Sequence, residues 1–364
     1  MREISYSRKI RFQFLLYSIF LFFLLEVLLR LPTFPSIQFR LDDKKLHCLQ
    51  TSGGLFSIPW MRLYQNQSLE LYHPEKNIRY HVSTDFRGER FTSVGSANGS
   101  DSAGRNSYNV NAPEIWVLGD SVALGYLVSD QESLPWALQN ELIKYKKSDI
   151  VRNLGVDALG SFGIQERLTE VLQTSPPPKV AYWIYHISDF TDSFRELELQ
   201  NSVKKRIFVR VSYFLSKYSA VFNAFKISYE KYKPESADNL VIPSSGSVLG
   251  PDHPHRKAAV SLFTYVKEKN IPLVLVFLPE PNEKYEPIVD SALVKEVRQI
   301  AIDSKIPVLD LQQPIYDYWK KGNQEIFLPK DGHPNPALYR FIAEELGKGI
   351  IKIISHGAHR EHGG

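Results

Sequence analysis

Five short apolar segments are the feature that most constrains the fold of this 364-residue chain. They lie at residues 115–118, 150–154, 180–185, 271–278 and 306–311. Segments with the apolar spacing of amphipathic helices alternate with them, at 134–146, 164–172, 257–269, 288–302 and 337–353. Strands that are apolar on both faces and alternate with helices are typical of a parallel sheet that is covered by helices on both sides. The pattern therefore predicts an α/β domain with a five-stranded parallel sheet.

A continuous apolar run precedes these segments, from Phe12 to Leu29, and Glu26 is its only charge. Its eighteen residues rise about 27 Å as a helix, which is close to the ~30 Å of a hydrocarbon core. We expect an uncleaved transmembrane anchor, because no small-residue cleavage site follows; a cleaved signal or a buried helix is the alternative. The basic residues before the run predict that everything after Pro32 lies outside the cytoplasm.

These patterns divide the chain into four regions. Residues 1–32 are the cytoplasmic N-terminus and the anchor, 33–111 a β-rich lead-in that ends in a mobile low-complexity loop, 112–354 the α/β domain, and 355–364 a tail. Residues 191–251, between the third and fourth strands, interrupt the alternation. We expect them to form a partly helical insertion, which either covers the site or is a plain surface excursion.

Charge and cysteine content exclude several classes of protein. The 44 basic and 40 acidic residues are spread along the chain without a basic block of the kind that binds nucleic acid. The single cysteine, Cys48, can form neither an intramolecular disulfide nor a thiolate-rich zinc site. His356, His359 and His362 lie in the tail, which we expect to fray. We therefore expect no metal, no cofactor and no nucleic-acid partner.

A serine follows the first strand of the sheet, in the sequence Trp116-Val117-Leu118-Gly119-Asp120-Ser121. Ligands of open parallel sheets bind beyond the carboxyl ends of the strands, so Ser121 is a candidate nucleophile, although a surface turn is the alternative. Serine needs a base to accept its proton and a third group to orient that base. Asp331 and His333 supply such a pair before the last helix, where Asn335 can also cap the helix.

These residues resemble the SGNH or GDSL-type esterases and acylhydrolases, over about residues 113–353. The segment from Thr84 to Arg90 is similar to one found in the membrane-anchored subgroup of that family. The resemblance implies a three-layer α/β/α sandwich. It also implies that Ser121 is the nucleophile, His333 the general base and Asp331 the acid that orients it.

The resemblance further implies an oxyanion hole with three donors. The backbone N–H of Ser121 is the first, and a glycine N–H after the second strand is the second, for which we prefer Gly160 to Gly155. The third is a side chain after the third strand, where Ser188 stands in place of the family's asparagine. Losing such a donor typically costs roughly 10²–10³ in rate. Ser188 or His186 therefore compensates, or the reaction is slow.

The function expected from the sequence is that of a membrane-anchored, extracytoplasmic serine esterase or acylhydrolase. Its substrate would be an ester-bearing small molecule, lipid or glycan. Two alternatives stay open: an O-acyltransferase acting on an envelope glycan or lipid, and a non-catalytic envelope-binding protein with a degraded site.

Overall fold

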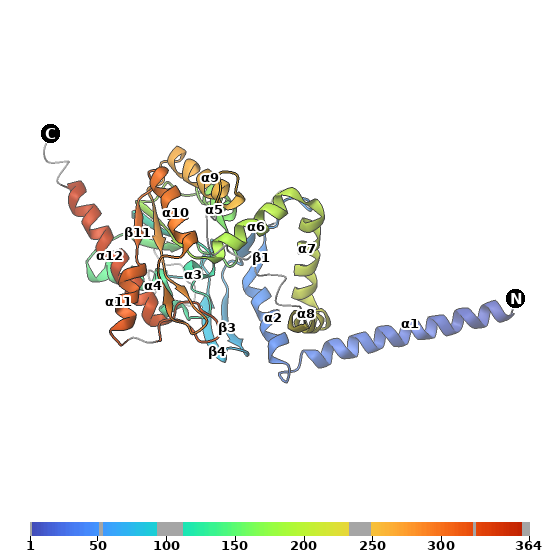
Figure 1. Ribbon diagram of the computed structural model, residues 1–364. Coiled ribbons are helices and arrows are strands. Elements are labelled where there is room, and N and C mark those ends of the chain that lie inside the picture. The colour runs from blue at the N-terminus through green and yellow to red at the C-terminus, as the bar shows by residue number, and fades with distance from the viewer. Residues whose placement is uncertain (1, 51–53, 93–111, 233–248, 323–324, 359–364) are drawn as a thin grey trace.

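The computed structural model describes the chain at residues 2–50, 54–92, 112–232, 249–322 and 325–358 (Figure 1). The expected low-complexity loop at the end of the lead-in lies outside these residues. So do part of the insertion and the last six residues of the tail.

A five-stranded parallel sheet forms the centre of the domain, as the sequence predicts. Its strands are β5 Glu114–Leu118, β6 Ile150–Asn153, β7 Val180–Tyr185, β8 Leu273–Phe277 and β11 Val308–Asp310, in the order β11-β8-β7-β5-β6. All six residues of β7 are buried, which explains why its sequence is apolar without alternation. β5 and β7 are neighbours in the sheet, so residues that leave these two strands emerge side by side.

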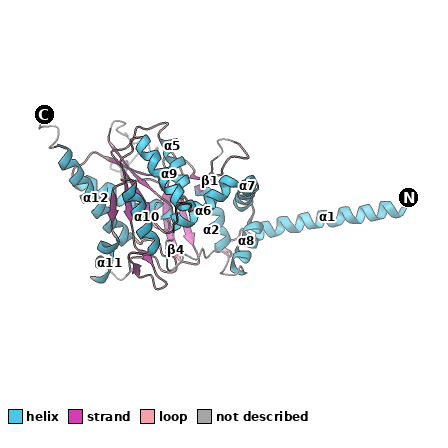
Figure 2. Cartoon of the chain, turned by 45° about the horizontal axis from the view of Figure 1, so that its top comes forward, coloured by secondary structure: helices cyan, strands magenta, loops and turns pink. Residues whose placement is uncertain are grey.

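Helices cover both faces of the sheet, so the expected three-layer α/β/α fold is confirmed (Figures 1 and 2). On one face the core contains Val117 and Ile184 together with residues of α4 Leu134–Lys144, α11 Gln312–Lys320 and α12 Pro336–Ala358. On the other it contains Trp116 and Trp183 together with residues of α5 Ser161–Val171, α9 Pro254–Glu268 and α10 Ala292–Asp303. Successive strand residues thus enter opposite cores, as the pleat of a strand requires.

The lead-in contains a helix that the expectation of a β-rich region omitted. α2 spans Pro35–Leu46 and buries Ile37 and Leu41, which lie one turn apart. Proline at its start and lysines in its last turn are ordinary helix signals. Two antiparallel hairpins follow it, β1 His47–Leu49 with β2 Met61–Leu63, and β3 Ser68–His73 with β4 Ile78–Ser83.

A tight turn follows the second hairpin of the lead-in. The Asp85 carboxylate accepts the N–H groups of Arg87 and Glu89 at 2.8 and 3.0 Å. Gly88 has φ +71°, and a Cβ there would lie 2.7 Å from the carbonyl oxygen of Leu63, so the turn requires glycine.

Arg90 leaves this turn and is buried against the loop that follows Ser121. Its guanidinium pairs with Asp130 at 2.9 Å and donates to the carbonyl oxygens of Leu124 and Val128 at 3.1 and 2.6 Å. One side chain of the lead-in thereby holds the backbone beside the candidate nucleophile.

The insertion begins as three helices, α6 Ser188–Asn201, α7 Val203–Tyr218 and α8 Ala220–Tyr232. The N-terminal helix α1, Arg2–Leu29, projects away from the domain on the side of α7 and α8 (Figure 1). Within the described residues it is the one helix long and apolar enough to cross a membrane, over Arg11–Leu29.

Removing the Arg90 guanidinium is expected to destabilise the whole domain. Arg90→Ala leaves the buried Asp130 without its cation, a loss that typically costs about 3–5 kcal/mol. Arg79→Ala is the matched control, because Arg79 is exposed and lies over the Tyr72 ring, a contact worth about 0.5–1 kcal/mol. The free energy of unfolding in urea measures both. Equal losses for the two variants would contradict an anchoring role for Arg90.

Candidate active site

Ser121 lies at the carboxyl end of β5, where the chain turns sharply into the short helix α3 Ser121–Leu124. Gly119 makes this turn with φ +141°, and a Cβ there would lie 2.9 Å from the carbonyl oxygen of Ile184 on the neighbouring strand. Asp120 caps α3 by accepting the N–H of Val122 at 2.9 Å. The buried sheet and the cap together set the position of Ser121.

His333 and Asp331 reach Ser121 from a loop that precedes α12. The Ser121 Oγ and the His333 Nε2 are 2.8 Å apart, across 212 positions of the sequence. His333 Nδ1 in turn contacts Asp331 Oδ1 directly. Asn335 caps α12 by accepting the N–H of Leu338 at 3.0 Å, so the loop forms the helix cap and presents the histidine at the same time.

The charges around His333 favour its protonated form. Burial of the ring lowers its pKa, but the hydrogen bond and charge of Asp331, with the charges of Asp120 and Asp157, raise the pKa above the ordinary 6.5. Burial opposes ionisation of Asp331, yet His333 and Lys76 bring the pKa of Asp331 down to about 2. Lys76 lies 3.4 Å from Asp331 Oδ2 and comes from the β3–β4 turn.

The ion pair of His333 and Asp331 stabilises the fold most between pH 3.8 and pH 6.5, the ordinary pKa values of the two groups. A raised His333 pKa contributes stability below pH 6.5, which is lost as the pH rises through the raised value. A lowered Asp331 pKa contributes stability above pH 3.8, which is lost as the pH falls toward about 2. Both contributions are present between these limits.

The N–H of Gly160, the glycine preferred for the oxyanion hole, has an acceptor within the protein. That N–H donates to Glu196 at 2.7 Å, and the same carboxylate accepts from Phe162 and Gly163 at 3.1 Å each. Glu196 thus occupies the N-terminus of α5. Within the described part of the chain, the N–H of Ser121 has no acceptor.

The hydroxyl of Ser188, which was expected to donate to an oxyanion, contacts two other side chains of the site. Its hydroxyl donates to Asp120 Oδ2 and lies 2.6 Å from His186 Nδ1. The backbone N–H of Ser188 also donates to His186 Nδ1, at 3.4 Å. Burial and the nearby His333 lower the pKa of His186, so its ring is neutral at pH 7.

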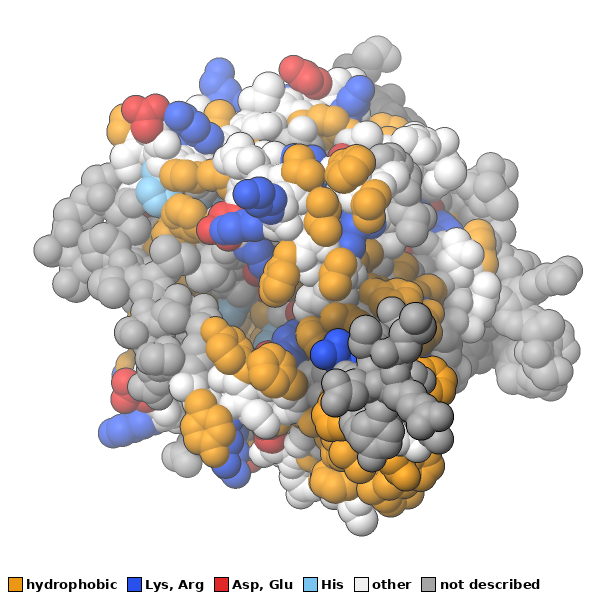
Figure 3. Space-filling view, turned by 90° about the vertical axis from the view of Figure 1, so that its right-hand side faces the viewer, with side chains coloured by type: hydrophobic (Ala, Val, Ile, Leu, Met, Phe, Trp, Pro, Cys, Tyr) orange, Lys and Arg blue, Asp and Glu red, His pale blue; other side chains and the backbone are white. Residues whose placement is uncertain are grey.

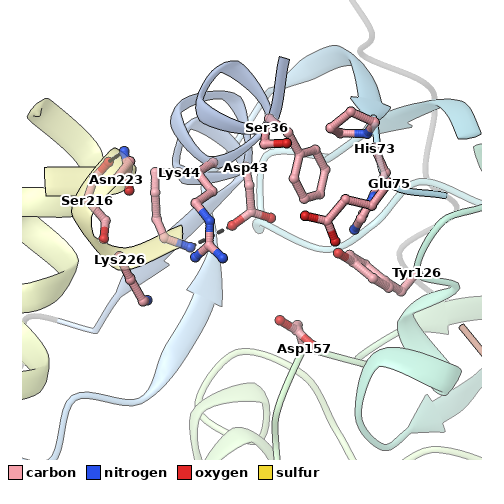
Figure 4. Close-up of a pocket in the computed structure, with 13 residues that line it drawn as sticks. Ser36, Asp43, Lys44, His73, Glu75, Tyr126, Asp157, Ser216, Asn223 and Lys226 are labelled. Atoms are coloured by element: carbon pink, nitrogen blue, oxygen red, sulfur yellow. Dashed lines mark hydrogen bonds and ion pairs between the residues drawn. The ribbon is translucent and has the colours of Figure 1, made fainter. Parts of the chain in front are cut away.

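A polar cavity of about 270 Å³ lies in the same region as His333, and neither His333 nor Ser121 lines it. Tyr126 joins the two, because its ring lies 5.3 Å from the His333 ring and also lines the cavity. Figure 4 shows Lys226 and Lys44 on one side of this space and Glu75 and Tyr126 on the other. The ionisable and aromatic residues that line it come from the lead-in, the insertion and the α/β domain: Phe39, Arg40, Asp43, Lys44, His73, Glu75, Tyr126, Asp157 and Lys226.

Several members of this site have no sequence signal of their own. The fold brings Tyr126 and Asp157 near His333, and Lys76 near Asp331. Nothing in the local sequence of these three residues marks them. Among the residues described, no group of three or more His, Cys, Asp or Glu side chains is arranged to hold a metal ion.

Comparisons with known proteins find similarity in structure alone. No family model matches the sequence, and no curated protein matches it. Among the solved structures that are similar to this chain are esterases and lipolytic proteins of the G-D-S-L family.

Three of these structures share 14–16% sequence identity with this chain. A two-domain esterase (CEX) active on acetylated mannans is 16% identical to this chain, with a TM-score of 0.41. The match covers 66% of this chain and 50% of the esterase, so this chain spans about half of that protein's length. The psychrotrophic esterase EstA from Pseudoalteromonas sp. is 14% identical, with a TM-score of 0.40 and coverage of 67% and 99%. A G-D-S-L lipolytic family member from Veillonella parvula is 15% identical, with a TM-score of 0.38 and coverage of 63% and 93%.

The titration of His333 tests the electrostatics of the site. In the parent protein its NMR titration midpoint is expected above pH 6.5, because Asp331 stabilises the charged ring. Asp331→Asn should lower that midpoint by about 1–3 pH units. Asp317→Asn, which removes an exposed carboxylate on α11, should leave it unchanged. An unchanged midpoint in Asp331→Asn would show that the contact does not govern the charge of His333.

Proposed function

We propose that this protein is a serine ester hydrolase, with Ser121 as nucleophile, His333 as general base and Asp331 as the group that orients His333. The observation that carries the proposal is the 2.8 Å contact between Ser121 Oγ and His333 Nε2, continued from His333 Nδ1 to Asp331. This is the arrangement that makes a serine hydroxyl nucleophilic. A degraded binding protein would have no need to keep all three groups in contact.

The reaction follows from the positions of the donors and acceptors. Ser121 Oγ attacks the ester carbonyl while its proton passes to His333 Nε2, and Asp331 stabilises the imidazolium. The backbone N–H of Ser121, which has no acceptor among the described residues, donates to the negative charge that develops on the carbonyl oxygen. His333 then protonates the leaving alcohol, and the acyl group stays on Ser121. Attack by water, with His333 again as base, releases the acid and restores Ser121.

The cavity beside Tyr126 favours a substrate rich in hydroxyl groups, such as an acylated glycan. Three cations, three carboxylates and three aromatic or imidazole rings line it, so it offers hydrogen-bond partners and ring faces to a sugar. An acyl chain of a lipid would remove water from these charged groups and offer them no hydrogen-bond partner, which is costly. The membrane anchor α1 would hold this site on the extracytoplasmic side, since basic residues precede the span.

Ser121→Ala is expected to abolish both ester turnover and labelling by an active-site phosphonate. The alanine variant keeps the buried turn of α3, so its free energy of unfolding should change by less than about 1 kcal/mol. Ser261→Ala is the control, because Ser261 is on α9 and bonds Gln165 away from the site. Phosphonate labelling followed by mass spectrometry reads out the modified residue. Equal labelling of the Ser121→Ala variant would remove Ser121 from the mechanism.

The hydroxyl of Ser188 is expected to act by positioning Asp120 and His186. Ser188→Ala leaves the buried Asp120 short of a donor, which typically costs about 1–3 kcal/mol of stability. It should lower kcat about tenfold or more with little change in KM, because Asp120 caps the turn that presents Ser121. Ser188→Thr keeps the hydroxyl and should recover most of the loss. A Ser188→Asn variant faster than the parent protein would instead show that the site lacks an amide donor.

A further inference from the structure

The helices of the insertion carry an apolar surface on the side where α1 leaves the domain. Its members on α7 are Phe208, Val211, Phe214, Leu215 and Tyr218, and on α8 Phe225, Tyr229 and Tyr232, all exposed. Phe208 is 70% exposed and Phe225 68%. Figure 3 looks at this side of the molecule and shows several groups of hydrophobic side chains there, with lysine and arginine side chains beside them. We call these eight residues the insertion surface.

α7 is oriented opposite to an ordinary surface helix, because its polar side faces the protein. Arg206 donates to the carbonyl oxygen of Phe56 at 2.7 Å, Arg210 to Ser57 Oγ at 2.8 Å and Tyr213 to the carbonyl oxygen of His47 at 2.6 Å. At 100° per residue these side chains lie roughly opposite Phe208, Val211, Leu215 and Tyr218. The lead-in thus holds the polar side, and the apolar side has no covering element among the described residues.

The C-terminal end of α1 forms hydrogen bonds with the junction between α7 and α8. Glu26 accepts the N–H groups of Ala220 and Val221 at 2.7 and 3.1 Å, at the start of α8. Arg30 pairs with Glu26 at 2.7 Å and donates to the carbonyl oxygen of Tyr218 at 2.7 Å, at the end of α7. A carboxylate therefore meets the positive end of one helix and a guanidinium the negative end of the other. Leu29 packs on the small core of Ile37, Leu41 and Ala220 beside them.

This junction determines where the insertion surface lies relative to a bilayer. α7 runs across the direction of α1, and both are on the same side of the domain (Figures 1 and 2). If α1 crosses the bilayer, α7 lies along its surface with the apolar side toward the lipid. Aromatic residues of the kind found on α7 and α8 are favoured at the headgroup level.

We propose that the insertion surface lies in the headgroup region of the bilayer that α1 spans, so that α7 and α8 form a second, monotopic contact with the membrane. This proposal rests on the membrane anchoring proposed above. The ligand class is a phospholipid surface. A second copy of this chain is the competing occupant, and the experiment below separates the two.

Spin labels on the full chain in vesicles of phosphatidylethanolamine and phosphatidylglycerol test this proposal. In a Cys48→Ser background, one label replaces Val211, which is 50% exposed on α7. Another replaces Ile302, which is 53% exposed on α10, a helix on the other side of the domain from α1 (Figure 1). A third label replaces Phe20 within α1 as the lipid reference. Collisions with a water-soluble nickel chelate should be lost at positions 20 and 211 and kept at 302. Tyr229→Cys on α8 repeats the measurement if Val211→Cys folds poorly.

Three outcomes would overturn the proposal. Chelate collisions at 211 equal to those at 302, with position 20 protected, would place the insertion surface in water while leaving the anchor intact. Collisions at position 20 as well would overturn the anchoring and, with it, the surface contact. Spin–spin broadening at 211 that disappears on dilution with unlabelled chain would show that a second copy covers the surface.

Discussion

Burial of the central sheet on both faces is the constraint on which the rest of this structure depends. With helices packed on each side, the strands β5 and β7 have no exposed edge or face where a polar group could be solvated. Polar side chains can therefore emerge only where a strand ends. Asp120 and Ser121 follow β5, and His186 and Ser188 follow β7 beside it. The polar side chains of the site are concentrated at the carboxyl edge of the sheet, because the buried faces of these strands exclude them.

The lead-in is part of the site although it precedes the α/β domain in the chain. Arg90 holds the loop after Ser121, and Lys76 lies near Asp331. The cavity has walls from α2, from the β3–β4 turn and from the insertion. A domain cut at residue 112 would lose the cation beside Asp331 and much of the cavity wall. The regions described from the sequence as separate therefore work as one folded unit around His333.

The sequence predicts those parts of this structure that depend on local patterns. The sheet was predictable because strands buried on both faces must be apolar throughout, and Ser121, Asp331 and His333 were candidates because they follow such strands or precede the last helix. The spacing of Gly160 to the next helix could not reveal that Glu196, thirty-six positions away, accepts its N–H. Helix α2 was missed although Pro35 and the terminal lysines mark it. Tyr126 and Asp157 could not be found, since only tertiary packing brings them to the site.

The two sides of α7 link membrane contact to substrate access. Ser216, on the inner side of α7, lines the same cavity as Tyr126, whereas Phe214 and Leu215, its immediate neighbours in the chain, are exposed on the outer side. One helix is thus both a wall of the cavity and, in our proposal, the element that rests on the bilayer. In the same proposal, the contacts of Glu26 and Arg30 join α1 to the end of this helix and fix the orientation of the cavity relative to the bilayer. A flexible tether would let the proposed esterase reach esters at any distance within its length, whereas this junction would restrict it to substrates held close to the membrane surface.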